Sequence, residues 1–254
     1  MDKRAGASVP KTGGDGSIVG VGRKIALASK NPGKIAEFQA MLSGLGFEIV
    51  PYEGPDISEI GKTFEENARI KAEAASLAMG LPAFADDSGL VIFSLSGEPG
   101  VRSHEYANEM GGPQAAMDDI LRRLKGLDRG AKFVSCLALV GFGDVLTFTG
   151  EINGWISETK RGEGGFGYDP IFVPNGTGDT FAEMDSNEKN AISHRARSFG
   201  QLVEFFVAEA RREAVDARRA EEAAKRESQK LKRESGAEEF EVEMEQASVQ
   251  KFND

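Results

Sequence analysis

The chain has 254 residues, of which 40% are hydrophobic and 28% are charged, a composition typical of a globular protein. No apolar run approaches the roughly 20 residues of a membrane-spanning helix, so no membrane association is expected. The formal net charge of −10 argues against non-specific nucleic-acid binding. The single cysteine, Cys136, excludes an intramolecular disulfide and a multi-cysteine metal site, and it fits a cytoplasmic location.

Composition divides the chain into three parts. Residues 1–20 lack the apolar stretch of a secretory signal, and we expect a disordered leader. Residues 21–210 are long enough for one substantial hydrophobic core. Residues 211–254 form a charged tail, for which we expect a solvated helix with i,i+4 ion pairs over 211–233 and then a disordered acidic segment.

The first predicted elements alternate between strand and helix. They are a strand at 24–28, a helix from Pro32 to about Leu42 closed by Gly44 and Gly46, a strand at 47–50, and a helix ending near Met79. Thr63 and Glu66 match a capping box at the start of this second helix, and Gly80 suits its C-cap.

Strands dominate the following stretch. We expect short strands at 82–85 and 90–93 on either side of a polar turn, a helix at 113–124, further strands at 132–140, 145–152 and 171–173, and a helix that begins near Ser193. The order predicts an α/β fold with a mixed sheet flanked by helices.

The polar segment Ser29–Lys34 joins the first strand to the first helix. Backbone N–H groups and the helix dipole favour an anion at such a turn, and Ser29, Asn31 and Lys34 add donors and a cation. The spacing is not that of a Walker motif, which disfavours a P-loop ATPase or GTPase. The alternative is an ordinary helix cap followed by a surface lysine.

Adjacent carboxylates, Asp86 and Asp87, follow a short apolar segment. Such a pair can hold Mg²⁺ and orient a water molecule. Because side chains alternate along a strand, one Asp is expected to face the site while the other supports it from the opposite side. Glu53 and Glu59 could supply a further metal oxygen. The alternative is a polar turn stabilised by Asx hydrogen bonds.

Two further segments indicate a pocket for a flat, phosphorylated ring. Gly162–Pro170 combines glycines with Phe166 and Tyr168, and an aromatic face offers a stacking surface. Lys189, His194 and Arg195 cluster at an expected helix entrance, where donors converge on anions. The histidines lack zinc-ligand spacing. These segments predict nucleotide binding.

The chain resembles the inosine/xanthosine triphosphate pyrophosphatases, which hydrolyse non-standard purine nucleoside triphosphates to the monophosphate and pyrophosphate. The matching segments are Ser29-x-Asn31-x-x-Lys34, Thr63-Phe64-x-Glu66-Asn67-Ala68, Ala85–Leu90, Gly164–Pro170 and Ser193-His194-Arg195. They occur in the family's order and cover nearly all of 21–210.

The resemblance implies an elongated α/β fold with a central substrate cleft, a homodimer and a Mg²⁺ requirement. It implies that Asp87 accepts the proton of the attacking water and that Glu59 and Asp87 hold the metal. The implied substrate residues are Ser29, Lys30, Asn31, Pro32, Gly33, Lys34, Ser88, Phe166, Gly167, Tyr168, Asp169, Lys189, His194 and Arg195. Phe166 would stack on the purine of ITP, dITP or XTP.

Two departures from the family pattern keep other functions open. Glu105 stands where the family usually has an arginine, and the charged tail extends past the family's usual end. A nucleotide sensor or scaffold that binds without turnover is one alternative. A related pyrophosphatase for pyrimidine or other modified nucleotides is another.

Overall fold

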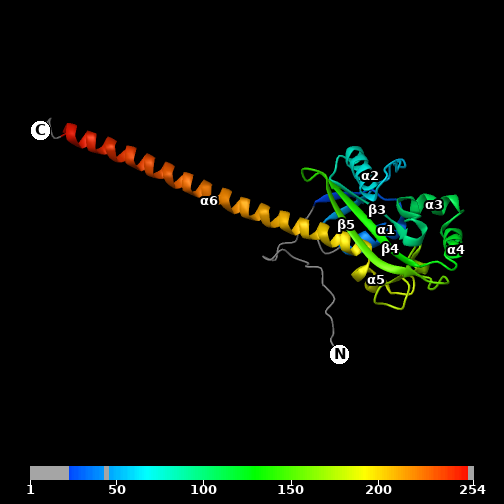
Figure 1. Ribbon diagram of the computed structural model, residues 1–254. Coiled ribbons are helices and arrows are strands. Elements are labelled where there is room, and N and C mark those ends of the chain that lie inside the picture. The colour runs from blue at the N-terminus through cyan, green and yellow to red at the C-terminus, as the bar shows by residue number, and fades with distance from the viewer. Residues whose placement is uncertain (1–22, 43–45, 251–254) are drawn as a thin grey trace, which may run out of the picture. The chain divides into compact units, whose positions relative to one another are not determined.

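The computed structural model describes residues 23–42 and 46–250, and it contains a six-stranded mixed sheet (Figure 1). The strands are β1 Lys24–Leu27, β2 Glu48–Pro51, β3 Ala83–Ile92, β4 Gly130–Val140, β5 Leu146–Ile156 and β6 Phe172–Pro174. Their order in the sheet is β2-β1-β3-β4-β5-β6. β1 pairs in parallel with β2 and β3, and the remaining pairs are antiparallel. The predicted α/β fold with a mixed sheet is therefore confirmed.

The described helices are α1 Pro32–Leu42, α2 Phe64–Met79, α3 Ser103–Glu109, α4 Pro113–Arg123, α5 Ser186–Ile192 and α6 His194–Gln250. The predicted caps of α2 are present: Thr63 Oγ1 accepts a hydrogen bond from the Glu66 amide at 3.1 Å, and Gly80 is left-handed with φ 62°. The Glu66 carboxylate accepts from the Lys62 amide at 2.6 Å, one residue before the position that a reciprocal capping box uses.

The polar turn predicted at Asp86–Gly89 is wrong, because β3 runs through it without a break. Its register with β4 extends from Ala83 opposite Val140 to Ile92 opposite Ala131. The two carboxylates need no solvated turn because buried cations pair with them, as described below. A second wrong expectation concerns the last helices: Lys189 lies in the separate short helix α5 rather than at the start of α6.

Alternate residues of β3 contact different helices. Phe84 meets Phe38 of α1 edge to face at 5.3 Å between ring centroids, and Phe38 in turn contacts Phe199 of α6. Ala83 and Ala85 belong instead to a cluster with the alanines of α2, where small side chains let the helix lie close to the sheet. Asp86 and Asp87 therefore point into two different layers.

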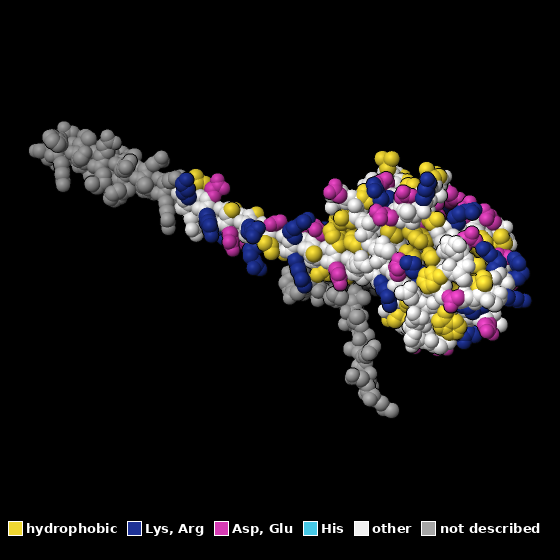
Figure 2. Space-filling model, in the orientation of Figure 1, with side chains coloured by type: hydrophobic (Ala, Val, Ile, Leu, Met, Phe, Trp, Pro, Cys, Tyr) yellow, Lys and Arg dark blue, Asp and Glu magenta, His cyan; other side chains and the backbone are white. Residues whose placement is uncertain are grey.

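The chain divides into two compact units, Met1–Val207 and Ala208–Asp254. In the second unit α6 continues to Gln250, so the acidic segment expected to be disordered is helical up to that residue. Side chains of both charges intersperse on the exposed surface of 211–231 (Figure 2), and Lys225 pairs with Glu221 at 2.6 Å, as expected for a solvated helix.

Within the described residues, no helix is both long and apolar enough to cross a membrane. The predicted leader and the expected helix stop at Gly44 lie outside the described residues.

Gly89→Ala tests the continuous strand. A Cβ at Gly89 would overlap the Gly100 carbonyl oxygen and Oγ of Ser103, so we expect the free energy of unfolding to fall by about 1–3 kcal/mol in urea denaturation. Gly178→Ala is the matched control, since a Cβ there meets nothing within 4 Å. Equal stability of the two variants would contradict the close approach of α3 to β3.

Candidate active site

The segment between β1 and α1 forms a helix cap. Asn31 Oδ1 accepts hydrogen bonds from the amides of Gly33 at 2.9 Å and Lys34 at 3.2 Å, while Ser29 Oγ accepts from the Asn31 amide at 3.3 Å. Two amides that we expected to be free for an anion are thus satisfied by Asn31. Lys30 leans outward to exposed Asp56 at 2.7 Å, and Pro32 is the first residue of α1.

Lys34 is not the surface lysine of the alternative interpretation. Its side chain is 15% exposed, and Nζ lies 2.8 Å from Asp86 Oδ2. Burial lowers the pKa of Lys34, and the Asp86 carboxylate opposes this effect. The first helix therefore directs a buried cation at the sheet.

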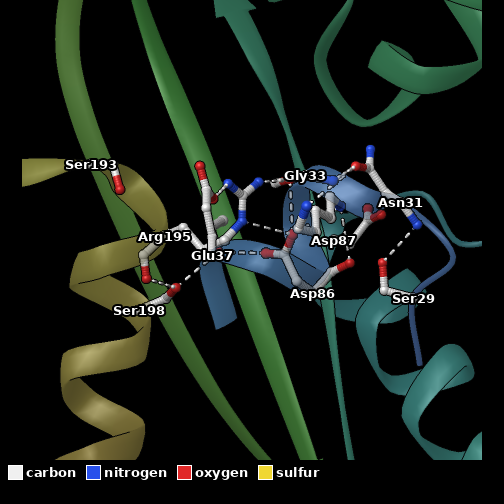
Figure 3. Close-up of polar contacts among 12 residues, drawn as sticks. Ser29, Asn31, Gly33, Glu37, Asp86, Asp87, Ser193, Arg195 and Ser198 are labelled. Atoms are coloured by element: carbon white, nitrogen blue, oxygen red, sulfur yellow. Dashed lines mark hydrogen bonds and ion pairs between the residues drawn. The ribbon is translucent and has the colours of Figure 1, made fainter. Parts of the chain in front are cut away.

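Asp86 is the fully buried centre of a polar cluster, with its residue 1% exposed. Arg195 Nε approaches Oδ2 at 3.4 Å, Ser88 Oγ lies 3.0 Å from Oδ2, and Ser135 Oγ donates to Oδ1 at 2.6 Å. Burial raises the pKa of Asp86, but Lys34 and Arg195 together hold it well below its usual range. Figure 3 shows Asp86 and Arg195 directed toward one another. Asp86 is thus the supporting member of the predicted carboxylate pair.

Asp87 faces α2 and shares a cation with Glu59. Lys71 Nζ lies 2.7 Å from Asp87 Oδ1 and 2.7 Å from Glu59 Oε1. Asn67 links Asp87 to Gly61, because its Oδ1 accepts from the Gly61 amide at 2.7 Å and its Nδ2 donates to Asp87 Oδ2 at 3.4 Å. Burial raises the pKa of Asp87, Lys71 lowers it, and Glu59 raises it, and the pKa stays above the ordinary value.

The two layers meet at one backbone atom. The Asp86 carbonyl oxygen accepts hydrogen bonds from Lys71 Nζ at 2.9 Å and from Lys34 Nζ at 3.3 Å. Although the two carboxylates leave β3 on opposite faces, Lys34 and Asp87 therefore belong to one contiguous polar site. This is the proximity that phosphate binding beside a carboxylate requires.

The oxygen ligands available around Asp87 are of the chemical type that Mg²⁺ prefers. Glu59 and Asp87 offer hard carboxylate oxygens that already converge on one cationic group, Lys71. Mg²⁺ is commonly held by one or two carboxylates, with water and substrate phosphates completing its coordination. The described residues include no cluster of three or more Asp, Glu, His and Cys side chains suited to a metal, so these carboxylates alone would not form a closed cage.

The Gly-rich segment and α5 form the other side of the site. Lys189 Nζ lies 2.7 Å from Asp169 Oδ2, 2.8 Å from Glu37 Oε1, and 4.6 Å from the centroid of the Phe166 ring. The Arg195 guanidinium carbon lies 5.3 Å from the same centroid. Phe166 therefore covers two buried cations. The half-buried ring also rests on Gly33, where a Cβ would overlap it.

The remaining predicted residues differ in whether their polar groups are already used inside the protein. Tyr168 is buried in the core and its hydroxyl donates to the Ser103 carbonyl at 2.8 Å, so its side chain is occupied. Gly167 is left-handed, with φ 62°. His194 stacks on Phe133 at 4.7 Å, and burial, reinforced by Arg195, lowers its pKa well below 6.5. Within the described chain its buried Nδ1 has no hydrogen-bond partner.

Several residues of this network were not predicted as site residues: Glu37, Asn67, Lys71, Ser135 and Ser198. Glu37 bridges Lys189 and Arg195, both of which it contacts through its carboxylate. Figure 3 shows Glu37 beside Arg195. Its position three residues after Lys34 on a helix was the available signal. Asn67 and Lys71 are likewise one turn apart on α2. Ser135 and Ser198 carry no sequence signal that distinguishes them from ordinary buried serines.

A mixed α/β sheet with buried lysines, an arginine and paired carboxylates defines a class of protein suited to a polyphosphate ligand. The chain belongs to the Ham1 family, whose model matches residues 25–205. A dITP/XTP pyrophosphatase from Symbiobacterium thermophilum is 47% identical over 188 residues, which are 72% of this chain and 94% of that protein. A dITP/XTP pyrophosphatase from Bacillus subtilis is 42% identical over 194 residues, 73% of this chain and 98% of the relative.

Solved structures agree with this assignment. A HAM1 protein from Coxiella burnetii superposes with a TM-score of 0.67 and 41% identity, over 73% of this chain and 99% of the other. The Ham1 protein of Staphylococcus aureus gives a TM-score of 0.67 and 37% identity, over 74% of this chain and all of the other. The resemblance inferred from the five segments is therefore confirmed.

Glu37→Gln tests the buried ion network. The variant removes the negative charge that Lys189 and Arg195 share, so both buried cations lose an ionic partner. We therefore expect the free energy of unfolding at neutral pH to fall by about 3 kcal/mol. Burial raises the pKa of Glu37, but Arg195 and Lys189 more than offset this and hold it below its ordinary value. The stabilisation is therefore present at neutral pH and is lost as the pH falls through the folded-state pKa.

The matched control is Glu48→Gln, which removes one partner of the exposed Lys24 pair and should change stability little. Urea denaturation at pH 7 and at a pH below the ordinary pKa of glutamate, about 4.3, measures both variants. Equal small losses in the two would contradict a buried, stabilising Glu37.

Proposed function

We propose that this protein hydrolyses non-standard purine nucleoside triphosphates, such as dITP, ITP and XTP, to the monophosphate and pyrophosphate. The observation that carries the proposal is the convergence of Lys34 and Lys71 on the carbonyl oxygen of Asp86, beside the Asp87 carboxylate. Phosphoryl chemistry needs cations for the anhydride and a carboxylate for the water, and both are within one site. The names of the relatives described above agree with this activity.

Asp87 acts as the proton acceptor for the attacking water in this proposal. Its pKa lies above that of an ordinary aspartate, which makes its carboxylate a stronger base. Asn67 and Lys71 fix the two carboxylate oxygens, so the base is already oriented when substrate arrives. Lys34 and Lys71 offset the charge of the phosphates and of the leaving pyrophosphate.

We further propose a Mg²⁺ requirement, with Glu59 and Asp87 as the protein ligands. Bound there, the ion would neutralise triphosphate charge and polarise the scissile phosphorus. Lys71 now joins the two carboxylates, so it would exchange part of this pairing for phosphate oxygens when substrate binds.

The base is assigned to the side lined by Phe166, Lys189, His194 and Arg195. Neutral His194 keeps a buried Nδ1 without a partner among the described residues, which suits a directional hydrogen bond to a purine edge. A site built around a 6-oxo group leaves donors unpaired when a 6-amino group is present, and such mismatches cost about 10⁴-fold or more in discrimination.

A substrate panel tests the proposed reaction. Purified protein with Mg²⁺ should release pyrophosphate from ITP, dITP and XTP, with kcat/KM at least about 10²-fold above the value for ATP, whose ring carries a 6-amino group. Ion chromatography distinguishes pyrophosphate from orthophosphate. Orthophosphate release would overturn the cleavage position, and equal turnover of ATP would overturn the selectivity. Chelation of the divalent ion with EDTA should abolish turnover, and full activity in EDTA would contradict the metal requirement.

Asp87→Asn tests the base. Amide for carboxylate preserves size but removes the proton acceptor, so kcat should fall by about 10²–10⁴-fold while ITP still binds in calorimetry. Lost binding together with lost turnover would argue against this role, and retained turnover would exclude it. Binding with turnover in the parent protein excludes the sensor alternative.

The pH dependence provides a second readout of Asp87. Because the base must be ionised, kcat/KM should fall as the pH falls through the pKa of Asp87. Lys71 lowers that pKa, so Lys71→Met should move the acid limb of the profile to higher pH. A shift to lower pH would contradict the assignment.

The homodimer and the cytoplasmic location implied at the outset are also proposals. Sedimentation analysis of the full chain tests the first and cell fractionation the second. Glu105, which stands where the family usually has an arginine, is exposed and pairs with Arg102 at 2.6 Å within its own chain.

A further inference from the structure

Two buried serines connect the N-terminal part of α6 to the centre of the ion network. Ser135 on β4 and Ser198 on α6 are both 0% exposed, and their hydroxyl oxygens lie 2.8 Å apart. Ser135 Oγ also lies 2.6 Å from Asp86 Oδ1. A continuous chain of hydrogen bonds therefore runs from helix α6 through strand β4 to Asp86.

The backbone is shaped to allow this contact. Ser135 lies opposite Ser88 on β3 and opposite Gly150 on β5. A Cβ at Gly150 would overlap the His194 carbonyl oxygen and the Ser198 amide nitrogen, so only glycine lets α6 sit this close to the sheet. The close approach brings the Ser198 hydroxyl within reach of Ser135.

The direction of the hydrogen bonds follows from counting protons. The Asp86 carboxylate is paired with Lys34 and Arg195, and Ser135 donates its hydroxyl proton to Oδ1 at 2.6 Å. The proton in the contact between the two serines then has to come from Ser198. Ser198 Oγ also lies 3.1 Å from the Arg195 carbonyl oxygen, which competes for the same proton. The hydrogen bonds between the serines and Asp86 therefore run in one direction, from Ser198 to Ser135 to Asp86.

We propose that Ser135 and Ser198 are positioning residues that orient the Asp86 carboxylate between Lys34 and Arg195. Ser135 holds Oδ1, which turns Oδ2 toward Lys34 Nζ at 2.8 Å and Arg195 Nε at 3.4 Å. Through Asp86, the two serines fix the positions of Lys34, the cation expected at the phosphates, and of Arg195, the cation expected at the base. The inference rests on the proposed nucleotide function, and it assigns the serines no contact with substrate.

The test is a double-mutant cycle with Ser135→Ala, Ser198→Ala and the double variant. Ser135→Ala removes a hydrogen bond to a charged group, so we expect KM for ITP to rise about 10-fold. Ser198→Ala removes a hydrogen bond between two hydroxyls, so we expect a rise of about 3-fold. In both variants kcat should stay within about twofold of the parent. Because Ser198 acts through Ser135, the double variant should match Ser135→Ala rather than show the product of the two effects.

Ser157→Ala is the matched control, since this serine is 3% exposed and donates to the Thr159 carbonyl at 2.7 Å, far from Asp86 in the hydrogen-bond network. It should lose stability and keep the parental KM. Multiplicative effects in the double variant, an unchanged KM, or a raised KM in Ser157→Ala would each overturn the proposal. If Ser135→Ala does not fold, two other variants still test the proposal. Ser135→Thr keeps the hydroxyl, so its KM must stay near the parental value. Ser198→Ala loses its hydroxyl, so its KM must rise.

Calorimetric binding of ITP in the presence of EDTA separates this inference from the proposed function. If the parent binds ITP without hydrolysing it under any condition, the hydrolase proposal fails. The positioning role then stands if Kd rises in the order predicted for KM, and it falls if Kd is the same in all variants.

Discussion

The requirement that dominates this structure is the compensation of charges buried on both faces of β3. Lys34, Lys71, Lys189 and Arg195 are all largely withdrawn from water, and each is paired with a carboxylate. Removing ions from water costs several kcal/mol apiece, which attraction offsets only when geometry and hydrogen bonding are good. The network therefore constrains α1, α2, α5 and α6 to fixed positions against the sheet, and packing alone would not impose that precision.

This compensation also determines what a ligand gains on binding. Lys34 and Lys71 already have carboxylate partners, so a polyphosphate gains only the difference between its contacts and those it displaces. Such a site is preorganised, because its cations are held in place before the ligand arrives. It also disfavours weakly charged ligands, which cannot replace a carboxylate. A triphosphate has the charge to make the exchange favourable, and a monophosphate product has less.

Local patterns in the sequence predicted the caps of α2, the strands and the residue types of the site, because these depend on neighbouring residues. The interpretation of Asp86–Gly89 as a turn failed for a non-local reason. Polar residues and glycine normally favour turns, but here Lys34 and Lys71 satisfy the carboxylates and Gly89 admits α3. The roles of Ser135 and Ser198 depend on the distance between a strand and a helix 63 residues apart, which no local pattern encodes.

Arg195 is largely occupied by contacts inside the protein. Its Nε, Nη1 and Nη2 contact Asp86, Glu37 and Ser88, so three of its five N–H groups are used inside the protein. Arg195 therefore contributes to the rigidity of the site as much as to donor capacity. Neutral His194, by contrast, keeps an Nδ1 without a hydrogen-bond partner among the described residues. The tautomer of a neutral imidazole decides whether Nδ1 donates or accepts, so in the proposed base pocket a 6-oxo group would require the tautomer that donates and a 6-amino group would require the other.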